Sequence, residues 1–208
     1  MRTTPSNLVI AIDGPAGAGK STVSRSLAEI LGIERLDTGA MYRAVAAAAI
    51  HHGVDLSDGA ALVALAEALT VEGDGEVLVA DLSVGHLLRL DATNSAVSLV
   101  AATPQVREVL VRHQRQWVED RNGSGVVEGR DIASVVFPDA TIKVYLTASA
   151  EERARRRVDE GAASIIRRDE VDSTRAVSPL HVAPGSRVLD TTGRTIEDVT
   201  GEILGWLA

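Results

Sequence analysis

The chain has 208 residues, of which 45% are hydrophobic and 24% charged, and its formal net charge is −8 at pH 7. This length suits one α/β domain with an appendage and allows a sizeable core. The negative charge argues against general nucleic-acid binding, because neutralisation of phosphates dominates that affinity. The absence of cysteine excludes disulfides, thiolate metal sites and cysteine nucleophiles. No apolar run reaches the roughly 18 residues of a membrane span, so we expect a cytoplasmic protein that binds neither nucleic acid nor membrane.

The first half of the chain predicts a strand, three helices and a hairpin. Residues 8–12 form a short apolar run that is typical of a buried parallel strand. Apolar residues at helical spacing predict helices over 20–31, 38–52 and 58–69. Valines on both sides of Gly73-Asp74-Gly75 then predict a small β-hairpin.

The second half alternates between helices and strands. The expected elements are helices over 91–102 and 104–121, strands over 126–127 and 141–146, a charged helix over 148–160, a polar arginine-rich segment over 161–179, a strand over 187–190 and a helix over 195–207. Strands that alternate with helices predict βαβ units and a mostly parallel sheet.

The strongest motif follows the first predicted strand. It fits the pattern GxxxxGK[ST] at every defined position and opens the first helix, and it reads Gly14, Pro15, Ala16, Gly17, Ala18, Gly19, Lys20 and Ser21, with Thr22 next. Such a loop wraps a phosphate with backbone N–H groups. Lys20 is expected to reach the β- and γ-phosphates, and the Ser21 hydroxyl to ligate Mg²⁺. A glycine-rich turn that binds nothing is the alternative, which the full motif in its proper context disfavours.

A phosphate-binding loop alone does not separate a kinase from a switch GTPase or an ATPase. The guanine-reading NKxD pattern is absent, which weakens the switch interpretation. Between residues 151 and 175 there are seven arginines and seven acids. This segment is either a solvated, self-paired helix or a second phosphate-binding cluster. The loop favours the second interpretation, because guanidinium groups bind phosphate bidentately and steady a transferring phosphoryl group.

Several ordered motifs resemble bacterial cytidylate (CMP/dCMP) kinases over nearly the whole chain. They read Ile12-Asp13-Gly14-Pro15, Lys20-Ser21-Thr22, Leu36-Asp37-Thr38-Gly39-Ala40-Met41-Tyr42-Arg43, Pro104-Gln105-Val106-Arg107, Gly129-Arg130-Asp131, Phe137-Pro138-Asp139-Ala140 and Arg175-Ala176-Val177-Ser178-Pro179-Leu180. The resemblance implies an α/β, three-layer P-loop fold with a mostly parallel central sheet, a small β-containing acceptor-binding insertion and a short lid. It also implies a monomer that uses ATP, Mg²⁺ and CMP or dCMP.

The same resemblance implies domain boundaries. The core is expected to comprise residues 1–37, 104–152 and 179–208. The acceptor-binding region is expected over 38–103, with the hairpin insertion near 71–90, and the lid over 153–178.

By motif position, the resemblance also assigns residues to the acceptor nucleotide. Thr38 and Arg43 are expected to contact it, Arg43 through its phosphate. Ser98 and Arg107 match residues that read cytosine together with Asp131.

Other matched residues are expected at the transferring phosphoryl group and at ATP. Arg130 matches a second arginine of the acceptor phosphate or of the transition state. The lid is expected to contribute Arg168, Asp172 and Arg175, of which Asp172 contacts the acceptor sugar and the two arginines bridge the phosphates. On the donor side, Arg153 is expected over the adenine and Arg157 at the phosphates.

The chain departs from the family's common pattern at a few positions. Glu128 stands where aspartate is common, Ala133-Ser134 stands where Gly-Thr is common, and few residues separate Arg157 from Arg168. Asp13 has two open interpretations, because it either orients a metal-bound water or caps the turn between strand and loop.

The expected activity is therefore phosphoryl transfer from ATP to CMP or dCMP. No strong general base is needed, since a phosphate's second pKa lies near ~6. Another small P-loop kinase, acting on AMP or shikimate, is the nearest alternative. A P-loop binding or switch protein with no acceptor is the alternative from another class.

Overall fold

The structure is a computed structural model that describes residues 6–72, 76–80, 82–88, 90–156 and 180–207. Its internal contacts divide the chain into two compact units, Met1–Leu36 with Val118–Ala208, and Asp37–Trp117. Residues 104–117 are grouped with the second unit by these contacts.

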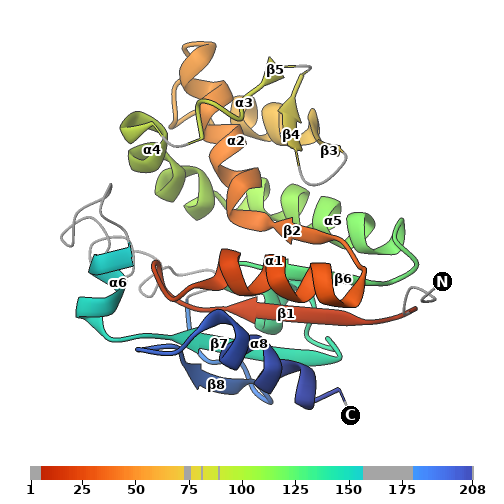
Figure 1. The fold of residues 1–208 in the computed structure, drawn as a ribbon. Coiled ribbons are helices and arrows are strands. Elements are labelled where there is room, and N and C mark those ends of the chain that lie inside the picture. Colours follow the sequence, from red (N-terminus) through yellow and green to blue (C-terminus); the bar gives the residue numbers. More distant parts are fainter. Residues whose placement is uncertain (1–5, 73–75, 81, 89, 157–179, 208) are drawn as a thin grey trace. The chain divides into compact units, whose positions relative to one another are not determined.

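The first unit contains a five-stranded sheet with the strand order β2-β6-β1-β7-β8 (Figure 1). Its described elements are β1 (Val9–Asp13), α1 (Lys20–Leu31), β2 (Arg35–Asp37), β6 (Gly125–Glu128), a π-helical turn η1 (Ile132–Val136), β7 (Ile142–Thr147), α6 (Ala150–Arg156), β8 (Arg187–Asp190) and α8 (Ile196–Gly205). The last residue of β2, Asp37, belongs to the second unit. Strand β1 pairs in parallel with β6 and β7, and β7 pairs in parallel with β8. The predicted α/β class with a mostly parallel sheet is confirmed.

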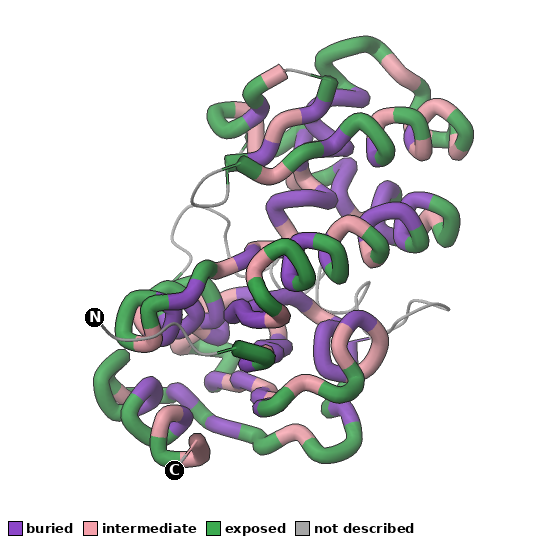
Figure 2. The backbone as a smooth tube through the Cα atoms, turned by 90° about the vertical axis from the view of Figure 1, so that its right-hand side faces the viewer, coloured by how far each residue is buried: buried purple, intermediate pink, exposed green. Residues whose placement is uncertain are grey.

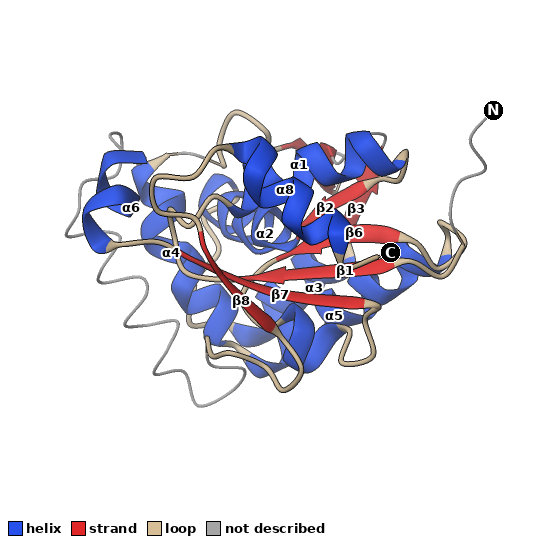
Figure 3. Cartoon of the chain, turned by 60° about the horizontal axis from the view of Figure 1, so that its bottom comes forward, coloured by secondary structure: helices blue, strands red, loops and turns tan. Residues whose placement is uncertain are grey.

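The central strand β1 is buried because both of its neighbours and the helices above it are apolar. In register, Ile10 lies opposite Val126 of β6 and Ile142 of β7. Helices α1 and α8 lie side by side on one face of this sheet (Figure 3). Leu27 of α1 and Ile203 of α8 join the strand side chains in one hydrophobic cluster. The residues at the carboxyl end of β1 are therefore held on a rigid base.

The second unit packs helices beside a small antiparallel sheet. Its elements are α2 (Thr38–His51), α3 (Gly59–Glu67), β3 (Leu69–Glu72), β4 (Glu76–Val79), β5 (Leu82–Ser83), α4 (Asp91–Ala102) and α5 (Pro104–Glu119), of which the last two residues of α5 belong to the first unit. Helix α2 contacts α3, α4 and β4. Its alanine-rich sequence is buried on nearly every side, which Figure 2 shows as buried stretches of the backbone. The antiparallel pairing of β3 with β4 confirms the predicted hairpin.

Several predicted elements coincide with the observed ones. The helices over 20–31 and 91–102 and the strand over 187–190 begin and end as predicted. Strand β2 and the π-helical turn η1 were not predicted. The charged helix expected over 148–160 begins later, as α6 at Ala150, because residues 148–149 are not helical. Residues 157–160 of that prediction and the segment 161–179 lie outside the described residues. In the described part of the chain, no helix combines the length and the apolar character needed to span a membrane.

Candidate active site

The phosphate-binding loop leaves β1 and enters α1, as its motif predicts (Figure 1). Gly14 has φ 148°, and a Cβ atom there would lie 2.1 Å from the carbonyl oxygen of Leu146. Gly17 has φ 78°, and a Cβ atom there would lie 2.8 Å from the carbonyl oxygen of Arg153. Glycine at these positions therefore lets the loop lie directly against the backbone of β7 and α6.

Lys20 is the first residue of α1, and its side chain turns back over the loop. Its Nζ donates hydrogen bonds to the carbonyl oxygens of Gly14 at 2.8 Å and Pro15 at 2.9 Å. The backbone N–H groups at the start of α1 carry the positive end of the helix dipole. The loop thus combines a fixed ammonium with a helix N-terminus, an arrangement that binds anions.

Ser21 follows Lys20, and its hydroxyl donates a hydrogen bond of 2.9 Å to Oε2 of Glu128. The other carboxylate oxygen, Oε1, accepts from Ser24 at 3.0 Å and from Nη1 of Arg35 at 2.6 Å. Glu128 is only 2% exposed, so its charge is balanced by Arg35 rather than by water. This cluster, with members on α1, β2 and β6, is tied to the phosphate-binding loop through Ser21.

A cavity of about 460 Å³ lies beside the loop within the first unit. It is lined by residues of the loop, of α6 and of the segment between β8 and α8, among them Gly19, Lys20, Ser21, Arg156, Thr191 and Ile196. Its wall is polar toward the loop and apolar toward α8. A site of this size and composition suits a nucleotide whose phosphates lie on the loop.

Arg156 is held at this cavity from three directions. Its Nε donates to Glu152 at 2.9 Å, and Nη1 and Nη2 donate to Oγ1 and the carbonyl oxygen of Thr191, each at 2.8 Å. Nη1 also lies 3.5 Å from the carbonyl oxygen of Gly17 in the loop. The sequence placed Arg156 on one helix face with Arg153 and Arg157 but gave it no role of its own, because one charge in a mixed-charge helix resembles its solvated neighbours. Thr191 was not predicted as a site residue.

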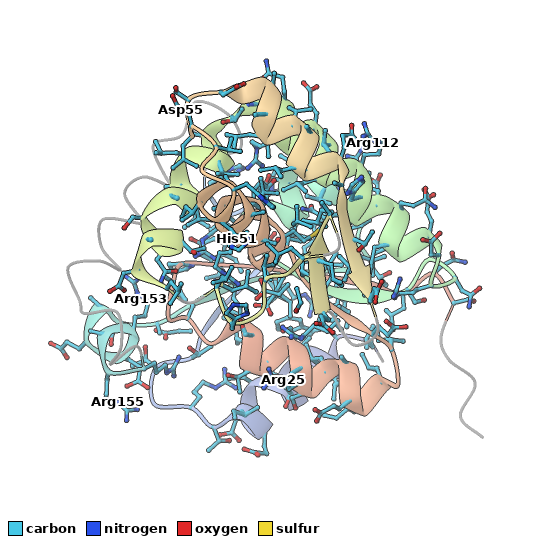
Figure 4. All side chains as sticks on the ribbon, turned by 90° about the horizontal axis from the view of Figure 1, so that it is seen from above. Arg25, His51, Asp55, Arg112, Arg153 and Arg155 are labelled. Carbon is cyan, nitrogen blue, oxygen red and sulfur yellow. The ribbon has the colours of Figure 1, made fainter. Side chains whose placement is uncertain are left out.

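Arg153, which the sequence assigned to the donor side, also reaches the loop. Its Nη1 donates to the carbonyl oxygen of Ala16 at 3.2 Å. Figure 4 shows that Arg153 and Arg155 both extend from α6. Arg155 is bound to Glu152 through two hydrogen bonds. The structure therefore brings α6 and the loop together through Arg153.

Asp13, the last residue of β1, is buried beneath the segment that follows β6. Its two carboxylate oxygens accept from the backbone N–H groups of Ile132 and Ala133, each at 2.8 Å. Burial raises the pKa of Asp13 from its ordinary 3.8 to about 6, against the opposing effect of these two hydrogen bonds. Asp13 thus caps a distant backbone segment, not the turn that follows its own strand.

The capped segment begins directly after Arg130 and Asp131. Arg130 donates from Nη1 to the carbonyl oxygen of Gly129 at 3.3 Å, and Asp131 is buried. Because Asp13 fixes the next two backbone amides, the direction in which these two side chains leave the chain is fixed as well.

In the second unit, Asp37 connects the start of α2 to Arg43. One carboxylate oxygen accepts from the backbone N–H of Ala40 at 3.0 Å and caps the helix. The other accepts from Nη2 of Arg43 at 3.0 Å. Thr38 lies at the same helix end and is buried. The predicted acceptor residues Thr38 and Arg43 therefore lie together at a helix N-terminus, where a phosphate is favoured.

The other predicted acceptor residues of this unit are Ser98 on α4 and Arg107 on α5. Arg107 is 4% exposed, its Nη1 donates to the carbonyl oxygen of Ala101 at 3.3 Å, and its guanidinium carbon lies 5.6 Å from the ring centre of Tyr42. Ser98 is half-buried. A buried arginine held by an aromatic ring and a carbonyl is rigid enough to recognise a planar base.

The structure describes most of the predicted site residues, but not all. Arg157, Arg168, Asp172 and Arg175 lie outside the described residues. Asp131 belongs to the first unit, and its predicted partners Ser98 and Arg107 to the second. Among the described residues, no group of three or more His, Asp or Glu side chains is placed to hold a metal ion.

Comparison with known proteins identifies the family. The family model of cytidylate kinase matches residues 10–207. The cytidylate kinases of Rhodococcus opacus (strain B4) and Mycobacterium leprae (strain Br4923) are 48% and 45% identical to this chain, over 96% and 95% of it and 94% of each relative. A sugar kinase from Janibacter sp. HTCC2649 shares the fold alone, with a TM-score of 0.50 and 16% identity over 98% of this chain and 95% of that one. The chain therefore belongs to the cytidylate kinase family of ATP-dependent phosphotransferases.

Proposed function

We propose that this cytidylate kinase transfers the γ-phosphoryl group of ATP to CMP or dCMP, giving ADP and CDP or dCDP. Membership of the family supports both substrates. The observation that carries the donor half of the proposal is the Lys20 ammonium, held over the carbonyls of Gly14 and Pro15 at the N-terminus of α1. A lysine and a helix N-terminus together are suited to the phosphates of a nucleoside triphosphate.

The reaction needs positive charge more than it needs a base. The phosphate of a nucleoside monophosphate has a second pKa near ~6, so it is largely ionised at neutral pH. The enzyme must bring two polyanions together in line and stabilise the charge that develops. We assign this task to Lys20 and Arg130, and to Arg168 and Arg175, which lie outside the described residues.

ATP is expected to bind together with Mg²⁺, and the hydrogen bonding of Ser21 suits a ligand of that ion. The Ser21 hydroxyl donates its proton to Glu128, so its oxygen lone pairs point away from that carboxylate. We propose that Ser21 holds the ion together with the phosphates of ATP. When bound there, Mg²⁺ would neutralise part of the charge of the ATP phosphates.

For the acceptor, we assign the phosphate to Arg43, with Thr38 beside it, and the base to Ser98, Arg107 and Asp131. Cytosine presents an exocyclic amino donor and ring acceptors, which match a carboxylate, a hydroxyl and a guanidinium. Uracil has an acceptor at the exocyclic position, so it would leave the carboxylate without a donor. The proposal therefore predicts that CMP and dCMP are better acceptors than UMP.

For the donor, we assign the cavity beside the loop to ATP. Residues 14–22 would hold the phosphates together with Arg157, and Arg153 would lie over the adenine, as the family resemblance implies. Arg156 is added because its guanidinium lines the cavity and is fixed by Glu152 and Thr191.

We further propose that residues 1–37, 104–152 and 179–208 form the core, 38–103 the acceptor region and 153–178 a closing lid. We also propose that the protein is a monomer and acts in the cytoplasm, where free nucleotides are its substrates.

The decisive experiment compares AMP, UMP, CMP, dCMP and shikimate as acceptors, with ATP and Mg²⁺ in excess. We expect CMP and dCMP to give the highest kcat/KM, and UMP a clearly lower one. A preference for AMP or shikimate would overturn the proposal. Slow ATP hydrolysis that CMP leaves unchanged would instead indicate a protein without an acceptor.

A further inference from the structure

Arg35 is a residue for which neither the motifs nor the family resemblance supplies a role. It lies on the short strand β2, and its Nη1 contacts Oε1 of Glu128 at 2.6 Å. Glu128 lies on β6, the neighbouring strand of the sheet. The side chain of Arg35 is 21% exposed and that of Glu128 is 2% exposed, so the pair connects the surface to a buried carboxylate.

The two oxygens of this carboxylate have different partners. Oε1 accepts from Arg35 and Ser24, and Oε2 accepts from Ser21. A hydroxyl has one proton and two lone pairs. While the Ser21 hydroxyl donates its hydrogen bond to the carboxylate, the lone pairs of that hydroxyl are directed elsewhere. A fixed carboxylate therefore fixes the direction in which Ser21 can act as a metal ligand.

The carboxylate is itself fixed by Arg35. Two hydroxyl donors do not balance a negative charge that is removed from water, whereas a guanidinium at 2.6 Å does. Without Arg35, Glu128 would be drawn toward water or toward other donors, and its bond to Ser21 would weaken. Loss of Arg35 would therefore change the orientation of the Ser21 hydroxyl more than the conformation of the loop backbone, which is held by Gly14, Gly17 and Lys20.

We infer that Arg35 is a positioning residue for the metal in this kinase: through Glu128 it orients the Ser21 hydroxyl toward Mg²⁺, and so strengthens the binding of Mg·ATP over metal-free ATP. The inference rests on the proposed function only in its assignment of Ser21 to Mg²⁺. It does not depend on the identity of the acceptor.

The test measures the Kd of ATP by calorimetry, once with excess Mg²⁺ and once with excess EDTA. Loss of a group that orients a metal ligand typically weakens metal binding about tenfold or more. We therefore expect Arg35→Met to raise the Kd of Mg·ATP about tenfold and to leave the Kd of metal-free ATP within about twofold. Arg35→Lys, which keeps the charge, should lie between the wild type and Arg35→Met.

Arg121→Met is the matched control. Arg121 also pairs with a glutamate, Glu34, at 2.8 Å, and its side chain is likewise 21% exposed, but Glu34 is 49% exposed. The control removes an arginine of the same exposure whose partner, unlike Glu128, is largely exposed to solvent. It should leave both Kd values unchanged.

A second variant keeps the inference testable if Arg35→Met does not fold. Arg35→Met with Glu128→Gln leaves no unpaired buried charge, and it should show the same loss confined to Mg·ATP. Equal losses with and without Mg²⁺ would indicate a merely structural role and overturn the inference, as would unchanged Kd values in both variants. Failure of the wild type to phosphorylate CMP would contradict the proposed acceptor and leave this comparison intact.

Discussion

Arg156 donates two hydrogen bonds to Thr191, one to Oγ1 and one to the carbonyl oxygen, each at 2.8 Å. The hydroxyl of Thr191 lies 3.1 Å from the carbonyl oxygen of Ala18. The guanidinium of α6, the segment after β8 and the phosphate-binding loop are thus joined at one residue. This contact fixes the plane of the Arg156 guanidinium at the edge of the nucleotide cavity.

Replacement of Arg156 should therefore impair ATP binding more than CMP binding. We expect Arg156→Ala to raise the KM for ATP about tenfold or more, because a charge-assisted contact contributes about 1.5–3 kcal/mol. Arg156→Lys keeps the charge but lacks the planar fork that reaches both acceptors of Thr191. Its KM for ATP should therefore lie between the values of the wild type and Arg156→Ala. Steady-state kinetics with each substrate varied in turn provides the measurement. An equal rise in both KM values would contradict the donor-side role.

Lys20 should be indispensable for turnover. We expect Lys20→Ala to lower kcat at least about a hundredfold, since it removes the ammonium that neutralises the transferring phosphoryl group. Lys143→Ala is the matched control, because Lys143 is the other lysine of the chain and its Nζ donates to an exposed carbonyl, that of Pro184. The control should retain wild-type kcat. Turnover retained by Lys20→Ala would refute the assignment of the loop.

Arg43 should matter for the acceptor and not for ATP. We expect Arg43→Ala to raise the KM for CMP about ten- to a hundredfold, the loss typical of a hydrogen bond between charged groups. The KM for ATP should stay within about twofold. Arg112→Ala, which breaks an exposed pair with Glu67 in the same unit, serves as the control. Similar effects on both substrates would argue against a contact with the acceptor phosphate.

Asp13 should make the stability of the protein depend on pH in the weakly acidic range. Its pKa is raised from 3.8 to about 6 by burial, so between these values the folded state holds more protons than the unfolded state. The free energy of unfolding should therefore fall as pH rises through this range, by up to about 3 kcal/mol. The stability from protonated Asp13 is complete below pH 3.8 and lost above about pH 6.

Asp13→Asn should remove this dependence. Denaturant unfolding at about pH 4 and about pH 7 gives the difference in free energy of unfolding between wild type and variant at each pH. The wild type should lose stability relative to the variant as the pH increases. Parallel pH profiles of the two proteins would show that Asp13 does not titrate in this range.

Features set by local spacing were predictable from the sequence. The phosphate-binding loop is defined by residues within one short stretch, and its position between a strand and a helix follows from an apolar run and a helical repeat. The helices over 20–31 and 91–102 have the same origin. In each case a few neighbouring residues carry the whole signal.

Features that depend on strand order were not predictable. Glu128 lies 107 residues from Ser21 and 93 residues from Arg35, and only the placement of β6 beside both β1 and β2 brings them together. Strand β2 escaped prediction because its three residues contain a single apolar side chain, Leu36. The cap of Asp13 on the segment 132–133 likewise follows from the sheet and not from local spacing.

The close approach of Gly14 to the carbonyl of Leu146 also tells a protein engineer where not to work. Every side chain introduced there would bring its first carbon to 2.1 Å from that oxygen, so a library randomised at this position would consist mostly of misfolded clones. The cavity wall also contains Arg155 of α6, whose side chain is 75% exposed and is bound to Glu152 of the same helix. Attempts to change the phosphoryl donor should begin there, where substitutions alter the shape of the pocket without moving the strand that supports the loop.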